Sequence, residues 1–284
     1  MNGENILIIG ANGQLGQALK LKYPGATAVD SDILDITSKI ALKNFELFNV
    51  RIIINAAAYT NVDGAETAEG RIAAWKVNAV ANSYLAEVAL EHGITLVHIS
   101  TDYVFDGTND NHKEDEPYSP LSVYGASKAA GDIALSILPN HYILRTSWVI
   151  GEGNNFVRTM IGLAQKGINP IVVNDQIGRL TFTSELVRAI DHLLERNSPF
   201  GIYNVTNDGD PASWADIARE IFKIAGYNNT VTGIKTVEYY KGKPDIAPRP
   251  LNSVMDLDKL HQTEFNSRSW QEDLNEYIKK EMEK

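Results

Sequence analysis

Tyr124 and Lys128 stand four positions apart in a segment that keeps a helical composition as far as Leu135. One turn of helix places the two side chains on the same face. A free phenol titrates near pH ~10 and a nearby cation favours the phenolate, so the Lys128 ammonium is expected to lower the pKa of Tyr124. The pair predicts acid-base chemistry. The alternative is a solvated helix face that carries two unrelated polar side chains.

A second pair with the same spacing, Tyr239 and Lys243, lacks the helix that this argument needs. Gly242 and Pro244 argue against a regular helix there. We therefore expect these two side chains not to share a helix face.

The composition is that of a globular protein with a substantial core. The chain has 284 residues, of which 44% are hydrophobic and 22% charged, enough for one large domain or a main domain with a smaller lobe. No apolar run approaches ~18 residues, so no membrane-spanning segment is expected. A net charge of -10 offers no basic surface to nucleic acid.

The residue types that are missing narrow the chemistry further. The chain has no cysteine, which excludes disulfides, thiolate metal sites and a cysteine nucleophile, and which is compatible with a cytoplasmic location. The amino terminus has no basic segment followed by an apolar one, so no secretory signal is expected. The six histidines show no metal-ligand spacing, and we predict no metal site.

A glycine-rich turn follows the first predicted strand. Residues 5–9 form a short apolar run typical of a parallel strand buried on both faces, and residues 17–22 have helical composition. The glycines between them, at 10–16, permit a tight turn and let a diphosphate approach the helix amino terminus. This order of strand, glycines and helix predicts a dinucleotide site, the alternative being a plain strand-to-helix turn.

Asp30 ends the second predicted strand, residues 26–29. A carboxylate at this position accepts hydrogen bonds from the adenosine ribose hydroxyls and repels a 2′-phosphate, so NADH is predicted to be preferred over NADPH. The alternative is an exposed loop aspartate. Asp35 and Ile36, which precede a predicted helix at residues 38–47, are expected to lie near the adenine.

Two further strands end at the same predicted edge of the sheet. Residues 51–55 lead into the small side chains of 56–58, which let a cofactor lie against the backbone, and residues 95–99 lead to Thr101. The Thr101 hydroxyl is placed to donate a hydrogen bond to a substrate carbonyl. We expect the polar stretch 109–123 to close over the site as a loop.

The order of the elements predicts the fold class. A helix at 69–91, with Asn78 facing either the sheet or solvent, and a fifth strand at 142–146 complete four strand-helix repeats, which call for an α/β fold with a doubly wound parallel sheet of the Rossmann type. Residues 1–150 are predicted to form this dinucleotide-binding domain, and residues 151–284 the last strands and a smaller, interleaved substrate lobe. The later elements are expected to be a helix that starts at 154–158, a strand at 171–173, a helix at 183–196, a strand at 201–205, a helix at 213–225 capped by Ser213, and a helix at 270–282.

Together the motifs resemble those of the extended short-chain dehydrogenase/reductase superfamily, over nearly the whole chain. The glycine turn and the Tyr/Lys pair are superfamily-wide, whereas STDYVFDG, RTSWV, GNNFVRTM and NDQIGR are specific to nucleotide-sugar reductases within it. The segments that carry the resemblance are GANGQLG at 10–16, NAAAYTNVD at 55–63, STDYVFDG at 100–107, VYGASK at 123–128, RTSWV at 145–149, GNNFVRTM at 153–160, NDQIGR at 174–179 and RPLNS at 249–253.

The resemblance implies an oxidoreductase that uses NADH or NADPH to reduce the C4 ketone of a dTDP-linked 4-keto sugar. Tyr124 would donate its proton to the incipient alkoxide, Lys128 would hold the nicotinamide ribose, and Thr101 would orient the ketone. The implied cofactor contacts are Gly10, Asn12, Gly13, Gln14, Leu15, Gly16, Asp30, Asp35, Ile36, Ala56, Ala57, Ala58, Tyr59, Thr60, Ile99, Tyr124 and Lys128.

The resemblance also implies a set of substrate contacts. Asn155, Arg179 and Arg249 are the implied contacts of the thymidine diphosphate, because a guanidinium group matches the paired oxygens of a diphosphate. For each arginine the alternative is a surface ion pair. The implied substrate contacts are Thr101, Asp102, Trp148, Asn155, Arg179 and Arg249.

Three positions depart from the pattern of the resembling reductases. Ala18 stands where some have a glutamate, which puts a Mg²⁺-linked dimer in doubt and leaves a monomer or a homodimer open. Leu180 and Met255 stand where a proline and a leucine are usual, beside the expected nucleotide-sugar contacts.

Two other functions stay open. Epimerases and dehydratases share the fold, but the dehydratase places an Asp-Glu pair after the threonine, whereas Asp102 is followed here by Tyr103. A non-catalytic regulatory subunit, such as the β subunit of methionine adenosyltransferase, resembles the chain as well. Because Thr101, Tyr124 and Lys128 are all present, an enzyme is favoured.

Overall fold

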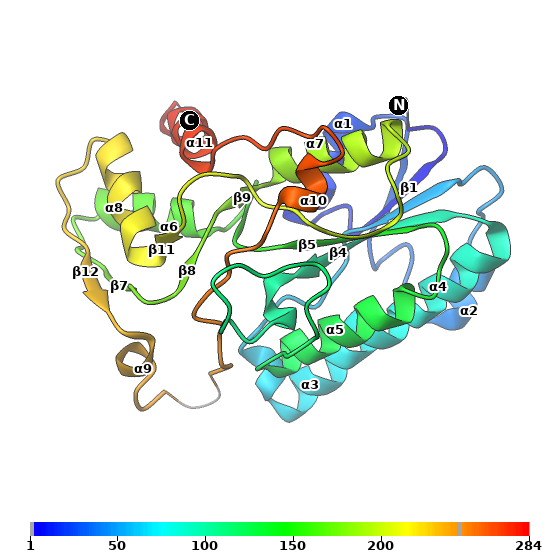
Figure 1. Ribbon diagram of the computed structural model, residues 1–284, viewed down its shortest axis with the longest axis horizontal. Coiled ribbons are helices and arrows are strands. Elements are labelled where there is room, and N and C mark those ends of the chain that lie inside the picture. The colour runs from blue at the N-terminus through cyan, green and yellow to red at the C-terminus, as the bar shows by residue number, and fades with distance from the viewer. Residues whose placement is uncertain (1–2, 244–245, 284) are drawn as a thin grey trace.

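The computed structural model describes residues 3–243 and 246–283, and its centre is a six-stranded parallel sheet (Figure 1). Each strand that crosses the core is a short apolar run, as expected for strands buried on both faces. The doubly wound fold predicted from the sequence is confirmed. In spatial order the strands are β2 (Thr27–Val29), β1 (Ile6–Ile9), β3 (Ile52–Asn55), β4 (Thr95–Thr101), β5 (His141–Thr146) and β10 (Gly201–Asn204).

Helices cover both faces of the sheet, because alternate side chains of each strand point to opposite sides. On one face Ile6, Ile8 and Leu144 pack in a core with α1 (Gln14–Lys22) and α7 (Thr183–Glu195). On the other face, a second core joins Leu7, Ile9 and Ile143 to three helices that run below the sheet in Figure 1. Those helices are α2 (Lys39–Asn44), α4 (Ala81–His92) and α5 (Val123–Leu135).

The predicted helix at 69–91 is continuous but not uniform. It consists of α3 (Ala68–Trp75), a π-helical turn at Lys76–Val80, and α4. Asn78 lies in the π turn and is buried; its amide donates to the Tyr59 carbonyl (3.1 Å) and to Ser127 Oγ (3.0 Å) and accepts from the Tyr59 N–H (2.9 Å). Of the two alternatives, solvent is excluded: Asn78 faces the interior, where it ties the loop after β3 to α5.

The second half of the chain returns to the main sheet and also builds a separate core. β10 is an edge strand of the main sheet and α7 covers one face of that sheet. Three other helices, α6 (Phe156–Gln165), α8 (Trp214–Ile224) and α11 (Trp270–Met282), pack around Met160, Ile221 and Leu274. Ser213 and Asp216 form a capping box at the start of α8, as expected from their spacing. The division into domains at residue 150 stays a prediction. The elements outside the main sheet are β6 (Val149–Ile150), α6 (Phe156–Gln165), β7 (Ile171–Val173), β8 (Ile177–Gly178), β9 (Thr181–Phe182), β11 (Ala212–Ser213), α8 (Trp214–Ile224), β12 (Thr232–Ile234), α9 (Thr236–Tyr239), α10 (Asp258–His261) and α11 (Trp270–Met282), with 3-10 turns at Gly64–Glu66 and Asp102–Val104.

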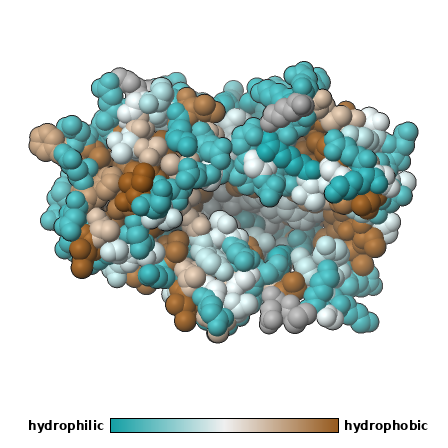
Figure 2. Space-filling view, turned by 180° about the vertical axis from the view of Figure 1, so that it is seen from behind, coloured by the Kyte–Doolittle hydropathy of each residue, from teal (hydrophilic) through white to brown (hydrophobic). Residues whose placement is uncertain are grey.

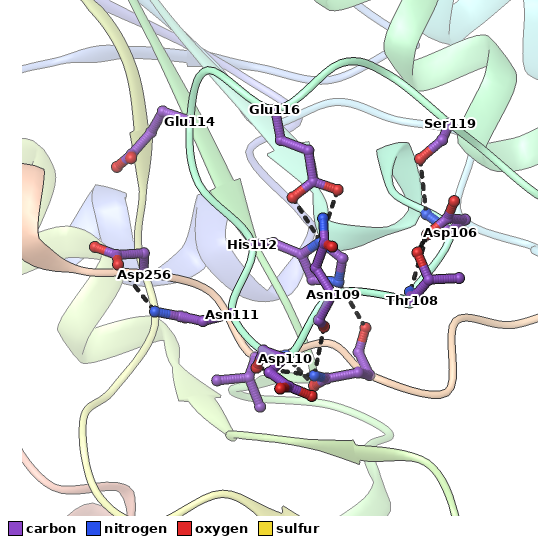
Figure 3. Close-up of polar contacts among 12 residues, drawn as sticks. Asp106, Thr108, Asn109, Asp110, Asn111, His112, Glu114, Glu116, Ser119 and Asp256 are labelled. Carbon is purple, nitrogen blue, oxygen red and sulfur yellow. Dashed lines mark hydrogen bonds and ion pairs between the residues drawn. The ribbon is translucent and has the colours of Figure 1, made fainter.

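The loop at 106–119 is tied to the carboxyl-terminal part of the chain (Figure 3). His112 Nδ1 lies 2.9 Å from a Glu116 oxygen, its Nε2 contacts the Asn252 carbonyl, and the Asn111 amide donates to Asp256. No residue of this loop lines either of the cavities described below. The segment at 109–123, predicted to close over the site, lines neither cavity, and several of its polar groups bond to the segment at 252–256. Its closing over the site stays a prediction.

The second Tyr/Lys pair does not lie on a helix. α9 ends at Tyr239, and the Lys243 ammonium lies over the ring of Tyr239, 3.9 Å from its centroid. The prediction that the two do not share a helix face is confirmed; Pro244, on which it partly rested, lies outside the described residues. Within the described part of the chain, none of the helices combines the length and the apolar character needed to cross a bilayer.

Candidate active site

A cavity of about 870 Å³ lies at the carboxyl edge of the sheet, and we call it the main cavity. Strands of a parallel sheet end together at this edge, so residues far apart in the sequence meet there. Figure 2, seen from behind, shows a hollow near the centre of this face of the molecule. Of the predicted site residues, those that line the main cavity are Gly10, Gly13, Gln14, Leu15, Asp30, Asp35, Ile36, Ala56, Ala57, Ala58, Tyr59, Thr60, Ile99, Thr101, Asp102, Tyr124, Lys128 and Trp148.

The glycine turn is shaped for a close approach of two backbones. Gly10 has a φ of 83°, and a Cβ added there would lie 2.6 Å from the Ala57 nitrogen. A Cβ on Gly16 would lie 2.1 Å from the Gly10 carbonyl oxygen. α1 begins at Gln14, three residues earlier than predicted, so Gly16 belongs to its first turn.

The cradle fits a dinucleotide. The amino terminus of α1 faces the main cavity through Gly13 and Gln14, without an acidic residue in its first turn, which suits a diphosphate. Asp30 is held in place by backbone groups: its carboxylate accepts from the N–H of Asn12 (3.0 Å) and of Ser31 (2.8 Å). A fixed carboxylate in this position suits the hydroxyls of an adenosine ribose.

Thr101, Tyr124 and Lys128 come together in the main cavity, and all three are buried. The Ser122 hydroxyl caps α5 by accepting from Gly125 N–H, which starts the helix one residue before Tyr124. Lys128 Nζ donates to the Ile99 carbonyl (2.6 Å) and lies 3.0 Å from His98 Nε2. These contacts hold the lysine against β4.

Burial raises the pKa of Tyr124, and the negative charge of Asp102 raises it further, while a hydrogen bond with Thr101 opposes the change. The Lys128 ammonium is not among the groups that shift it. The net direction is therefore opposite to the one expected from Lys128, whose Nζ donates to the Ile99 carbonyl. A raised pKa keeps the phenol protonated at neutral pH, which suits a proton donor.

Two other ionisable groups of the site are shifted by burial. Burial lowers the pKa of Lys128 to about 8, with Asp132 opposing the change. Burial raises the pKa of Asp102 to about 6, while hydrogen bonds from Ser253 (2.5 Å) and Thr101 (3.0 Å) favour its charged form. Such shifts beside a cavity are typical of functional sites.

A second cavity of about 320 Å³, here called the side cavity, adjoins the main one and shares Tyr103, Trp148 and Trp214 with it. Trp148 has a φ of 49° and stacks on Trp214 with ring centroids 3.9 Å apart. A tryptophan in the left-handed region is strained, and such residues gather at functional sites. The other residues that line the side cavity are Phe156, Met160, Ile171, Val172, Val173, Gln176, Tyr239, Tyr240 and Arg249.

The three residues implied as diphosphate contacts do not lie together in one cavity. Arg249 lines the side cavity and pairs with Asp63 (2.8 Å). Asn155 lines neither cavity; it caps α6 and donates to the Tyr277 hydroxyl. Arg179 lines neither one and donates to the carbonyls of Gly209 and Met255. The roles of these three residues toward the substrate stay predictions. The roles of Asn12 and Gly16 toward the cofactor also stay predictions, since neither residue lines the main cavity.

The sequence reasoning missed most of the side cavity. Tyr103 and Phe156 line it and lie inside the motifs STDYVFDG and GNNFVRTM, whereas Trp214 and Tyr240 come from segments without any motif that could have marked them. Gln176 lies inside NDQIGR, the motif that also contains Arg179. The motif was recognised correctly, but it is Gln176 rather than Arg179 that lines the side cavity.

Known proteins are similar to the chain along its whole length. A family model described as the RmlD substrate binding domain matches residues 4–283. A dTDP-4-dehydrorhamnose reductase of Aggregatibacter actinomycetemcomitans is 41% identical over 278 residues, which cover 90% of this chain and 92% of that protein. A solved dTDP-4-dehydrorhamnose reductase of Clostridium acetobutylicum has a TM-score of 0.88 at 39% identity, covering 96% of this chain and 98% of that one. Another, of Bacillus anthracis in complex with NADP, has a TM-score of 0.89 at 35% identity, covering 98% of each chain.

Proposed function

The chain belongs to the family of the RmlD substrate binding domain, and on that ground we propose that it is an NAD(P)H-dependent reductase of the dTDP-rhamnose pathway. It reduces the C4 ketone of dTDP-4-dehydro-β-L-rhamnose and forms dTDP-L-rhamnose. The observation that carries this function is the meeting of Thr101, Tyr124 and Lys128 in one cavity that begins at the glycine turn.

Each of the three side chains has a role that its surroundings support. Tyr124 Oη donates its proton to the oxygen at C4, and its raised pKa keeps that proton available at neutral pH. The Thr101 hydroxyl, which donates to Asp102 Oδ1 in this structure, turns its hydrogen to the ketone and orients it when the substrate binds. Lys128, anchored on the Ile99 carbonyl, holds ribose hydroxyls. A reduced nicotinamide supplies the hydride when it is bound.

The side cavity holds the nucleotide end of the substrate. The Arg249 guanidinium, which lies there beside Tyr240, binds the diphosphate, and the aromatic walls from Phe156 and Trp214 stack on the base. The stacked Trp148 and Trp214 line both cavities, and this supports a role for Trp148 beside the sugar ring.

Arg249→Ala is expected to raise the KM for the dTDP-sugar by about 10- to 100-fold with a smaller effect on kcat, since it removes charge-assisted hydrogen bonds to the diphosphate. Steady-state kinetics with varied sugar nucleotide measure this. Arg196→Ala is the matched control, because Arg196 is exposed and pairs with the exposed Glu264. An unchanged KM in Arg249→Ala would remove this arginine from the diphosphate site.

Asp30→Ser is expected to raise kcat/KM with NADPH relative to NADH by about tenfold or more, because the carboxylate that repels a 2′-phosphate is gone. The serine hydroxyl can still accept from the Asn12 N–H. Initial rates with each cofactor measure the ratio, and Asp32→Ser, an exposed aspartate outside the main cavity, is the control. The proposed preference of the natural chain for NADH is contradicted if its kcat/KM is higher with NADPH.

The function itself is tested with dTDP-4-dehydro-L-rhamnose and reduced cofactor, by following the loss of NADH or NADPH absorbance. We expect turnover with this substrate. The related epimerases and dehydratases would leave the reduced cofactor unconsumed at equilibrium, and an Asp-Tyr rather than an Asp-Glu pair after Thr101 speaks against elimination. Failure to oxidise NADH or NADPH with any 4-keto sugar nucleotide would favour a non-catalytic regulatory subunit.

Three properties stay predictions beside this function: a cytoplasmic location, a monomeric or homodimeric state, and the doubt about a Mg²⁺-linked dimer. Ala18 packs against the core between α1 and the sheet and offers no carboxylate.

A further inference from the structure

His98 lies on β4 behind the active site, is fully buried, and has no role in the reaction as described so far. Its two ring nitrogens both face nitrogen atoms. Nε2 lies 3.0 Å from Lys128 Nζ, and Nδ1 lies 3.2 Å from Asn55 Nδ2. A neutral imidazole has one N–H and one acceptor, so these contacts decide which nitrogen carries the hydrogen.

A chain of amides settles the question. Asn55 Oδ1 accepts from the Ala57 N–H (3.1 Å), which leaves Asn55 Nδ2 facing His98. That nitrogen also donates to Asn82 Oδ1 (2.9 Å), and Asn82 Nδ2 donates in turn to the Asn78 carbonyl (2.6 Å). Backbone groups thus fix the orientation of both amides. His98 Nδ1 is therefore the acceptor, and the ring hydrogen lies on Nε2.

The Nε2 hydrogen points at the active-site lysine. An ammonium has three donors and no lone pair, so the 3.0 Å contact is a hydrogen bond only when Lys128 is a neutral amine, which can still donate to the Ile99 carbonyl. Another acceptor is within reach: Asp132 Oδ1, 3.9 Å from His98 Nε2, is buried and has no hydrogen-bond partner.

We propose that His98 is a positioning residue that couples to the protonation of Lys128: its Nε2–H donates to Nζ of the neutral amine and turns to Asp132 Oδ1 when Lys128 becomes an ammonium. The hydrogen stays on Nε2 in both arrangements. Because the first arrangement stabilises the amine, His98 narrows the pH range in which Lys128 is charged. The catalytic consequence rests on the proposed reductase function, whereas the tautomer of His98 does not.

The surrounding charges agree with this coupling. Burial lowers the pKa of His98 well below its usual value, and the positive charge of Lys128 lowers it further, so the ring is neutral. Burial raises the pKa of Asp132, with Lys128 and Arg145 opposing the change. Arg145 Nε, on β5, lies 3.6 Å from Asp132 Oδ2, and Ser100 donates to the same oxygen (2.8 Å). On the cavity side, the ionisable neighbours are Tyr124 and Asp102.

The tautomer is tested by two-bond ¹H–¹⁵N correlation NMR on histidine-labelled protein, with His98→Gln to identify the signal. We expect His98 to be neutral, with its hydrogen on Nε2. Asn55→Asp is expected to move the hydrogen to Nδ1, because a carboxylate oxygen now faces that nitrogen while the Ala57 N–H keeps an acceptor. His141→Gln, on the neighbouring strand and bonded to the Leu138 carbonyl, is the control and leaves the His98 signal unchanged. An imidazolium, or a hydrogen on Nδ1 in the natural chain, overturns the proposal.

The consequence for Lys128 is tested by the pH dependence of kcat for reduction. The ammonium is present below its pKa of about 8 and is lost above it, so activity that uses the ammonium falls on the alkaline side. In His98→Gln the glutamine carbonyl accepts a hydrogen bond from the Lys128 ammonium and stabilises it. The alkaline limb of the pH profile, where kcat falls as Lys128 loses its charge, is therefore expected to move up by about one pH unit. A purely structural role lowers kcat without moving the limb, and that result overturns the proposal.

Asn55→Asp provides the same test if His98→Gln does not fold. With the hydrogen on Nδ1, the His98 Nε2 lone pair accepts from the ammonium, so the alkaline limb moves up again; an unmoved limb contradicts the coupling. If the natural chain reduces no 4-keto sugar nucleotide, the reductase function fails, while the NMR result still decides the tautomer.

Discussion

Tyr124→Phe is expected to reduce kcat for reduction of the 4-keto sugar by about 10²- to 10⁴-fold, the range associated with loss of a positioned general acid. The phenol is buried in the main cavity beside Thr101, so water does not readily replace the missing proton donor. Because phenylalanine keeps the ring and its edge-on contact with Tyr103, the fold and cofactor binding should be retained. The measurement is kcat from the loss of reduced-cofactor absorbance, together with a cofactor titration by fluorescence.

Tyr142→Phe is the matched control for this variant. Tyr142 lies on β5 and does not line the main cavity, and its buried hydroxyl donates to the Ser198 carbonyl. Its removal therefore tests the cost of losing a hydroxyl as such. We expect a small loss of stability and a kcat close to that of the natural chain. Equal turnover by Tyr124→Phe and the natural chain would remove Tyr124 from the mechanism.

Gly16→Ala is expected to abolish cofactor binding and to lower the free energy of unfolding by about 1–3 kcal/mol, as overpacking does in a tight site. Its Cβ would lie 2.1 Å from the Gly10 carbonyl oxygen and 2.8 Å from the Ala11 carbonyl carbon, both of which are backbone atoms that cannot turn away. The first turn of α1 must then shift from the cradle that it forms with Gly10. Urea unfolding and a cofactor titration measure the two effects.

The control for this variant is Gly162→Ala, in the middle of α6. A Cβ there meets nothing within 4 Å, so alanine should raise stability slightly, by about 0.5–1 kcal/mol, and leave cofactor binding unchanged. If Gly16→Ala bound the cofactor as tightly as the natural chain does, the close approach of α1 to the Gly10 turn would not be a requirement of the dinucleotide site.

The sequence by itself determined the elements of the main sheet and the residues at its carboxyl edge. Apolar β-branched runs, glycines after the first strand and the helical spacing of Tyr124 and Lys128 depend on neighbours a few positions away. The parallel order of strand and helix then leaves few topologies, and it brings Thr101 to the same edge as the glycine turn. This part of the fold and site could therefore be predicted.

Only the tertiary structure decided what lies around those residues. Asn78 and His98 received their roles from partners on other elements, and Asn155 and Arg179 turned to carbonyls and a tyrosine outside the cavities. The side cavity collects aromatic residues from several separate segments. The pKa of Tyr124 is raised rather than lowered, because burial and the negative charge of Asp102 both favour the protonated phenol. Burial and long-range contacts are set by how distant segments pack, and residue spacing along the chain carries no record of them.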